Sequence, residues 1–179
     1  MAKRHLLPSL PENTIIMTLE QLLQSRDRRA AMQRLLLEKY SGHTPVVLTV
    51  VMPGADKQTK AAAIVAEAAV EALDKAFGNK ISSRLLRDLT TGFEAYLTVD
   101  MPAEQAKKTT VEIEENHPLG RLMDIDVIGP DAMPVSRRIQ RRCLICNRPA
   151  RECMRARTHS TQELLSCIDR LCDEYLQHP

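Results

Sequence analysis

The chain has 179 residues, 44% of them hydrophobic, which is long enough for one domain with a core of its own. The net charge is only +2, and aromatic residues make up 3% of the chain, with no tryptophan. Proteins that bind single-stranded nucleic acid stack bases on aromatic faces, so nucleic acid is a poor candidate ligand. No stretch approaches the roughly 18 apolar residues of a membrane span.

The start of the chain and its cysteines indicate in which cellular compartment the protein resides. In MAKRHLLPSL the apolar run is too short for a signal peptide, and Pro8 interrupts it. The chain has five cysteines, and an odd number does not suit a disulfide framework. We therefore expect a cytoplasmic protein that does not associate with membranes.

The first half of the chain predicts a leader and three regular elements. Residues 1–17 have the character of an extended leader. Thr18 and Gln21 form a capping box that opens a helix, which the polar run 25–29 is expected to interrupt before Gly42 and Pro45 end it. A β-branched run then predicts a strand over 45–54, and a helix follows over about 56–77.

The second half predicts further strands and helices. Strands are expected over 81–89, 93–99, 122–128 and, in a hairpin with the last of these, 135–139; helices are expected over 102–115 and 161–177. Two strand–helix–strand passages imply an α/β sandwich (α+β in the wider sense) with a mixed sheet flanked by helices.

The segment HPLGRLMDIDVIG carries two aspartates, Asp124 and Asp126, in an apolar strand. Side chains alternate along a strand, so both carboxylates point to one face while Ile125 and Val127 join the core on the other. Two carboxylates on one face could hold Mg²⁺, which completes its shell with water and phosphate oxygens. The alternative is an acid pair on a solvent-exposed strand face, which is common.

The residues just before this strand favour the metal site. Gly120 allows the backbone or a phosphate to approach closely, and Arg121 offers a fork of donors to phosphate oxygens. The chain has a helix, then a glycine turn, then a strand carrying D-x-D. This order of elements resembles that of the polymerase-β-like nucleotidyltransferases. Those enzymes usually carry a third carboxylate, for which the candidates are Glu94, Glu112 and Glu115.

Four segments together resemble one family over nearly the whole chain: LLQSRDRR, TVVMPG, HPLGRLMDIDV and RRCLIC. The chain is similar to the apo-citrate lyase phosphoribosyl-dephospho-CoA transferases, also called holo-citrate lyase acyl-carrier-protein synthases. The most specific part is G-R-L-x-D-x-D-V, from Gly120 to Val127. We expect one nucleotidyltransferase-like domain over 1–179, with a segment rich in cysteine and arginine at 137–179.

The resemblance implies a transferase. Such an enzyme moves a phosphoribosyl-dephospho-CoA group from triphosphoribosyl-dephospho-CoA to a serine of the citrate lyase acyl-carrier (gamma) subunit and releases pyrophosphate. Asp124 and Asp126 would hold Mg²⁺, and Gly120 and Arg121 would contact the donor. The alternatives are another Mg²⁺-dependent nucleotidyltransferase of this fold and a non-enzymatic module that binds through zinc and arginines.

Basic residues suggest two further contact regions. Arg26 and Arg29 lie in the family-like segment near the start, and they are candidates for phosphate or carrier contacts, because acyl-carrier domains are usually acidic. Eight arginines and one acid lie between residues 136 and 159, a patch that could attract phosphates. A solvated polar surface is the alternative for both regions.

The cysteine segment has the ligand types of a zinc site. Cys143, Cys146, Cys153 and His159 would make a Cys₃His set, and four protein ligands leave no open position, so the role would be structural. Three small buried cysteines with a surface histidine are the alternative.

Overall fold

The computed structural model describes residues 18–177; the leader expected over 1–17 lies outside them. Its strands form one sheet in the order β2-β3-β1-β4. The strands are β1 (Thr44–Val50), β2 (Ile81–Leu89), β3 (Gly92–Val99) and β4 (Met123–Val127). The helices are α1 (Leu19–Lys39), α2 (Lys60–Phe77), α3 (Ala103–Asn116), α4 (Ala150–Ala156) and α5 (Thr161–Gln177), with 3₁₀ turns η1 (Gly78–Lys80) and η2 (Gly120–Leu122).

The expected sandwich of helices and one sheet is confirmed, but the sheet is not mixed. Each pairing between described strands is antiparallel. The two strand–helix–strand passages do join strands that run the same way, yet β3 separates β1 from β2 and β1 separates β3 from β4. The element order β-α-β-β-α-β is that of the ferredoxin-like, or split β-α-β, arrangement.

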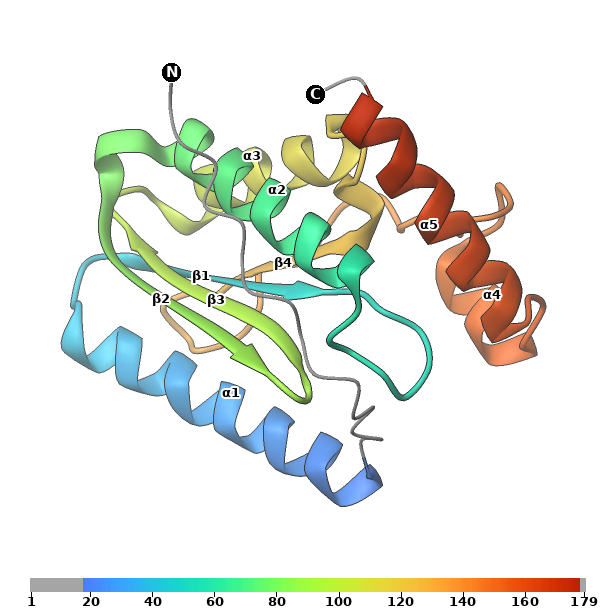
Figure 1. Ribbon diagram of the computed structural model, residues 1–179. Helices are drawn as coiled ribbons and strands as arrows, with labels where there is room; N and C mark the ends of the chain where they lie inside the picture. The colour runs from blue at the N-terminus through green and yellow to red at the C-terminus, as the bar shows by residue number, and fades with distance from the viewer. Residues whose placement is uncertain (1–17, 178–179) are drawn as a thin grey trace.

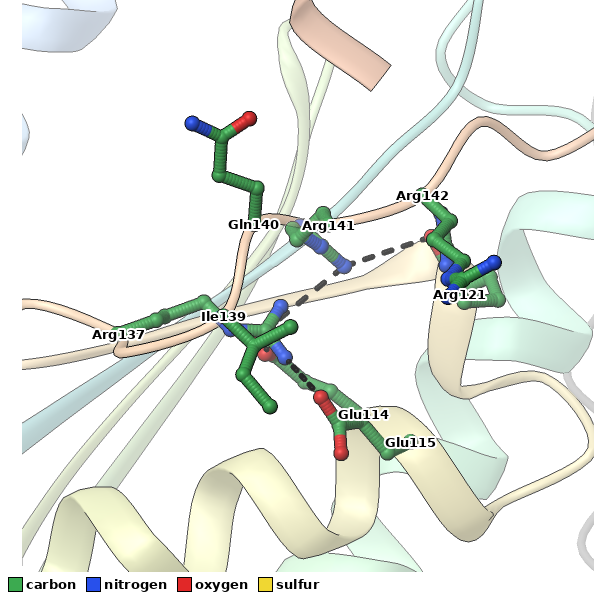
Figure 2. Close-up of a pocket in the computed structure, with 8 residues that line it drawn as sticks. All are labelled: Glu114, Glu115, Arg121, Arg137, Ile139, Gln140, Arg141 and Arg142. Atoms are coloured by element: carbon green, nitrogen blue, oxygen red, sulfur yellow. Dashed lines mark hydrogen bonds and ion pairs between the residues drawn. The ribbon is translucent and has the colours of Figure 1, made fainter. Parts of the chain in front are cut away.

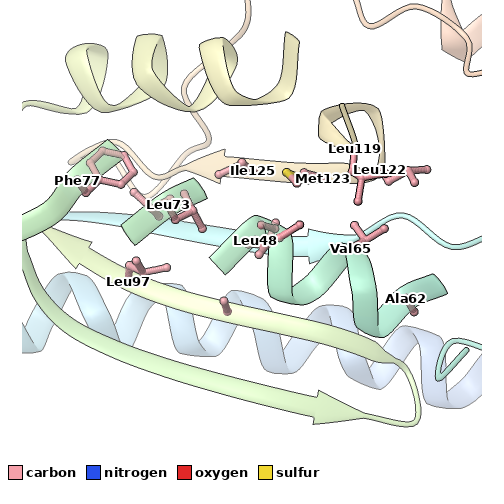
Figure 3. Packing of buried hydrophobic residues seen from close by; sticks show 14 of the residues in the cluster. Leu48, Ala62, Val65, Leu73, Phe77, Leu97, Leu119, Leu122, Met123 and Ile125 are labelled. Atoms are coloured by element: carbon pink, nitrogen blue, oxygen red, sulfur yellow. The ribbon is translucent and has the colours of Figure 1, made fainter. Parts of the chain in front are cut away.

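The two faces of the sheet are covered differently (Figure 1). Helices α2 and α3 cover one face, and the main core lies between them and the sheet, with α5 contributing Ile168 and Cys172. Figure 3 shows Leu73 of α2 and Leu48 of β1 in this core. Helix α1 covers the other face, where Leu36 packs with a smaller apolar cluster on the sheet.

Helix α1 runs without a break through the polar segment 25–29, so the expected interruption is wrong. The predicted capping box is present: Thr18 Oγ1 accepts from the Gln21 backbone N–H, and the Gln21 side chain accepts from the Thr18 N–H. No proline or glycine lies within the helix, and only Ser25 of the polar run is buried. A solvent-exposed turn of charged residues does not break a helix that is otherwise anchored.

The outer edge of β4 is covered by side chains. The buried Glu114 of α3 accepts from the Ile125 N–H at 2.8 Å, and Lys107 Nζ donates to the Ile125 carbonyl at 3.0 Å. An open strand edge would otherwise present these groups to other chains. The strand expected over 135–139 is absent, since only Val135 bonds to β4 (Val127 O) and Ile128 bridges to Pro134.

Most other boundaries lie within two residues of the prediction, but strand β1 ends at Val50, four residues before the predicted end at residue 54. Strand β2 and helix α5 begin and end where they were predicted, while α2 begins at Lys60, because Thr59 caps it through the Ala62 N–H. Helix α4 was not predicted. Among helices within 18–177, none is long and apolar enough to cross a membrane.

Candidate functional site

The two aspartates of β4 share the sheet face that α1 covers. Ile125 and Val127 are fully buried in the main core on the opposite face. Asp124 and Asp126 are paired across the ladder with Thr49 and Val47 of β1. The predicted alternation is therefore confirmed, and the two carboxylates belong to one surface.

Asp126 lies in a partly buried, charged environment. Burial raises the pKa of its carboxyl, and the neighbouring Asp124 raises it further, whereas Lys107, Arg141 and Arg29 oppose that rise. Two like charges brought together in partial burial favour a bound cation. Their oxygen ligands suit a hard divalent ion, so Asp124 and Asp126 are the residues here that could hold one.

Arg141 links Asp124 to the loop that follows β4. Its Nη1 donates to Asp124 Oδ1 at 2.7 Å, and its Nη2 donates to the carbonyls of Met123 and, at 3.4 Å, Arg121. The Asp124 side chain keeps 47% of its surface exposed. Asp124 is thus fixed on one side by a guanidinium and open on the other.

Glu94 was a candidate third carboxylate, and the structure places it on the same sheet face as the aspartates. It pairs with Thr49, the β1 residue that also pairs with Asp124, so one strand lies between the two acids. Its buried carboxylate accepts from Arg29 Nη1 at 2.8 Å and from the Tyr96 hydroxyl at 2.6 Å. Glu94 therefore anchors Arg29 over this face.

The other candidate acids lie in α3, in the layer on the opposite face of the sheet. Glu112 is exposed, and Glu115 accepts from Arg137 at 2.8 Å. The two candidate arginines of α1 also differ: Arg29 reaches the sheet through Glu94, whereas Arg26 is exposed. The structure thus brings Arg29, but not Arg26, to the aspartate face; donor contact by either residue stays a prediction.

Gly120 is explained by backbone packing. A Cβ at this position would lie 2.6 Å from the carbonyl oxygens of Ile113 and Glu114, at the end of α3. The residue must therefore be glycine for η2 to begin against the helix. Arg121 follows at once, and its side chain enters a cleft; phosphate binding by Gly120 stays a prediction.

Four arginines line a cleft of about 290 Å³ beside the β4 edge (Figure 2). They are Arg121, Arg137, Arg141 and Arg142, accompanied by Glu114, Glu115, Ile139 and Gln140. Burial raises the pKa of Glu114. Its Oε2 atom forms an ion pair with Arg137 Nη1 at 3.1 Å. Sequence reasoning found the arginine-rich segment but assigned neither Glu114 nor the individual arginines of residues 137–142.

The predicted Cys₃His set comes together. The ligand atoms of Cys143, Cys146, Cys153 and His159 all lie within 4.8 Å of one another. Tetrahedral zinc bonds of about 2.0–2.3 Å place ligand atoms roughly 3.3–3.8 Å apart, and the Cys146 Sγ atom lies 3.5 Å from Cys153 Sγ and 3.4 Å from His159 Nε2. Hydrogen bonds from Arg148 and His159 lower the pKa of Cys146 to about 6, which favours the thiolate that binds metals.

His117 ends α3 and has a structural role. Its Nδ1 accepts from the Leu119 N–H at 3.0 Å, and its ring packs on Tyr175 with centroids 5.4 Å apart. Burial lowers its pKa. A protonated ring could not accept the Leu119 hydrogen bond.

We expect the free energy of unfolding to fall as the pH drops below about 6.5, since the unfolded chain then takes up a proton that the folded His117 resists. The loss of one hydrogen bond is worth roughly 1 kcal/mol. Urea titrations between pH 7 and pH 5 measure this slope. His117→Asn keeps an acceptor but cannot titrate, so it should flatten the slope; an unchanged slope in this variant would refute the assignment.

Paired carboxylates next to clustered arginines define a class: enzymes that transfer phosphorus-containing groups combine such residues. The particular family is shown by comparison. The family model described as apo-citrate lyase phosphoribosyl-dephospho-CoA transferase matches residues 17–175, and the chain belongs to this family. The resemblance found in the sequence is thereby confirmed.

Relatives with the same description match along almost their whole length. A protein of Escherichia coli is 36% identical over 178 residues, covering 95% of this chain and 96% of the relative. One of Citrobacter koseri is 37% identical over 175 residues, covering 93% and 94%. One of Shigella boydii is 35% identical over 178 residues, covering 95% and 96%. Each is named apo-citrate lyase phosphoribosyl-dephospho-CoA transferase.

Proposed function

We propose that this chain transfers the phosphoribosyl-dephospho-CoA group from triphosphoribosyl-dephospho-CoA to a serine of the citrate lyase acyl-carrier (gamma) subunit. The family match over residues 17–175 carries this proposal. In the reaction, the serine oxygen forms a bond to the phosphorus nearest the ribose. The bond from that phosphorus to the bridging oxygen breaks, and pyrophosphate leaves with its electron pair.

The carboxylates of Asp124 and Asp126 are the proposed Mg²⁺ ligands. Their common face and the raised pKa of Asp126 support this role. The ion, when bound, supplies positive charge that offsets the charge developing on the transferred phosphorus and on the leaving pyrophosphate. A carboxylate not engaged by the ion can orient the serine hydroxyl and accept its proton.

Basic residues around the aspartates are the proposed donor contacts. Arg121, in the η2 turn just before β4, lines the arginine-rich cleft, and Arg29 is held over the aspartate face by Glu94. Arg26 and Gly120 complete the set expected from the family segments. Arg26 and Arg28 are exposed on α1, where they would complement an acidic carrier domain.

The Cys₃His cluster is the proposed site of a structural Zn²⁺. The four ligands would tie together the loop after β4, helix α4 and the turn that leads from α4 into α5. Closed coordination leaves no position for substrate. The free thiols of all five cysteines are consistent with a reducing, cytoplasmic location.

Release of pyrophosphate tests the proposal. We expect release only when donor, Mg²⁺ and apo carrier are all present, and none when the acceptor serine of the carrier is replaced by alanine. Pyrophosphate release without carrier would instead indicate hydrolysis of the donor, and equal release with the serine-free carrier would contradict the proposed acceptor.

A further inference from the structure

The arginine-lined cleft has more positive charge than the protein itself neutralises. Four guanidinium groups line it, against the carboxylates of Glu114 and Glu115. Arg137 pairs with both glutamates, and Arg141 pairs with Asp124 at 2.7 Å and, at 4.0 Å, with Glu114. Among residues 18–177, no ion pair is recorded for Arg121 or Arg142.

Arg121 is affected by the other positive charges that line the cleft. The pKa of its guanidinium is lowered by burial and then by the charges of Arg141 and Arg137. Its Nε is buried and has no hydrogen-bond partner within the described residues, and the same holds for Nε of Arg137. Buried donors without acceptors and like charges close together are both relieved by a multiply charged anion with several acceptor oxygens.

The size and position of the cleft narrow the choice of anion. About 290 Å³ is at the lower end for a ligand pocket, too small for a whole coenzyme and suited to a short run of phosphates. Figure 2 shows Arg121 and Arg142 beside each other, and Arg141 extending between them and Arg137. Because Arg141 also contacts Asp124, the cleft begins where the aspartate site ends.

We propose that this cleft binds the two terminal phosphates of the donor, which leave as pyrophosphate. This assignment rests on the proposed function and extends it, because it places the leaving group at Arg121, Arg137, Arg141 and Arg142 and the bond that breaks near Asp124. Arg141 is then shared, since it holds Asp124 on one side and a departing phosphate on the other. Glu114 is a positioning residue that holds Arg137 and Arg141 toward the cleft.

Binding of inorganic pyrophosphate to the purified chain, measured by calorimetry with EDTA and without donor or carrier, tests the assignment. We expect Arg142→Gln to weaken binding about tenfold, as loss of one charge-assisted contact predicts. Arg142 is exposed and its side chain is unpaired within the described residues, so the variant should fold. Arg138→Gln, an exposed neighbour that does not line the cleft, is the matched control and should bind normally.

Three results would overturn the assignment: no pyrophosphate binding, equal weakening by Arg142→Gln and Arg138→Gln, or no weakening by Arg142→Gln. Pyrophosphate should also compete with the donor in carrier loading, and Arg142→Gln should raise the KM for the donor more than it lowers kcat. The two proposals can fail independently. If the chain modifies the carrier but pyrophosphate does not bind in the cleft, the proposed function stands and the cleft assignment is wrong. If pyrophosphate binds but the carrier is not modified, the proposed function is wrong.

Discussion

Asp126→Asn should reduce the rate of carrier loading by on the order of 100-fold or more, and Asp124→Asn should do the same. Each change keeps the size of the side chain and removes the charge that a divalent ion requires. Asp126 should show the clearer effect, because no hydrogen bond or ion pair of its side chain is recorded among residues 18–177. Asp124→Asn also removes the charge from the contact with Arg141, which donates to the Asp124 carboxylate in the unmodified chain.

Initial rates at saturating Mg²⁺, with thermal unfolding as a check on folding, measure this prediction. Asp126→Asn should not destabilise the fold, since burial and Asp124 already disfavour the charged form of Asp126. Asp169→Asn, an exposed aspartate of α5, is the matched control and should load carrier at the normal rate. Wild-type rates in both Asp124→Asn and Asp126→Asn would remove the metal-site assignment.

Cys146→Ser should release a bound metal and destabilise the chain. Purified protein should contain about one zinc per chain, and the variant should contain almost none. If the metal contributes about 3 kcal/mol, its loss lowers the Tm by roughly 6–12 °C for a chain of this size. Arg141 and Arg142 directly precede Cys143, so carrier loading should fall as well when the cluster no longer holds this segment in place.

Cys167→Ser is the control for the zinc prediction. Cys167 lies on α5 outside the cluster and makes two long contacts: its Sγ donates to the Leu144 carbonyl at 4.0 Å and accepts from Arg170 Nη2 at 3.8 Å. It should keep its zinc and nearly all its stability. Fewer than about 0.2 zinc per wild-type chain, or equal effects of Cys146→Ser and Cys167→Ser, would show that the cluster is not a structural zinc site.

Local signals predicted much of the fold. Thr18 and Gln21 identified the start of α1, and Asn116-His117 identified the end of α3, because caps and turns depend on neighbours in sequence. The antiparallel sheet was not predictable in the same way. Which strand lies between two others is decided by long-range pairing, and no local pattern in β1 or β4 records that β3 joins the other side of β1.

The site shows the same division. Strand alternation placed Asp124 and Asp126 correctly, and the C-x-x-C spacing led to a Cys₃His cluster that the structure confirms. The roles of Glu114 and Lys107 were missed. A signal was present: the buried positions of α3 recur at helical spacing, and polar residues occupy several of them. Only the position of the β4 edge explains why those side chains point inward.

Mass spectrometry of the intact carrier subunit tests the proposed transfer most directly. Apo acyl-carrier subunit of citrate lyase is incubated with this chain, triphosphoribosyl-dephospho-CoA and Mg²⁺. We predict that the carrier gains the mass of one phosphoribosyl-dephospho-CoA group, and that it gains nothing with the Asp126→Asn variant over the same interval. A carrier whose mass stays unchanged with the wild-type chain would contradict the proposed transfer.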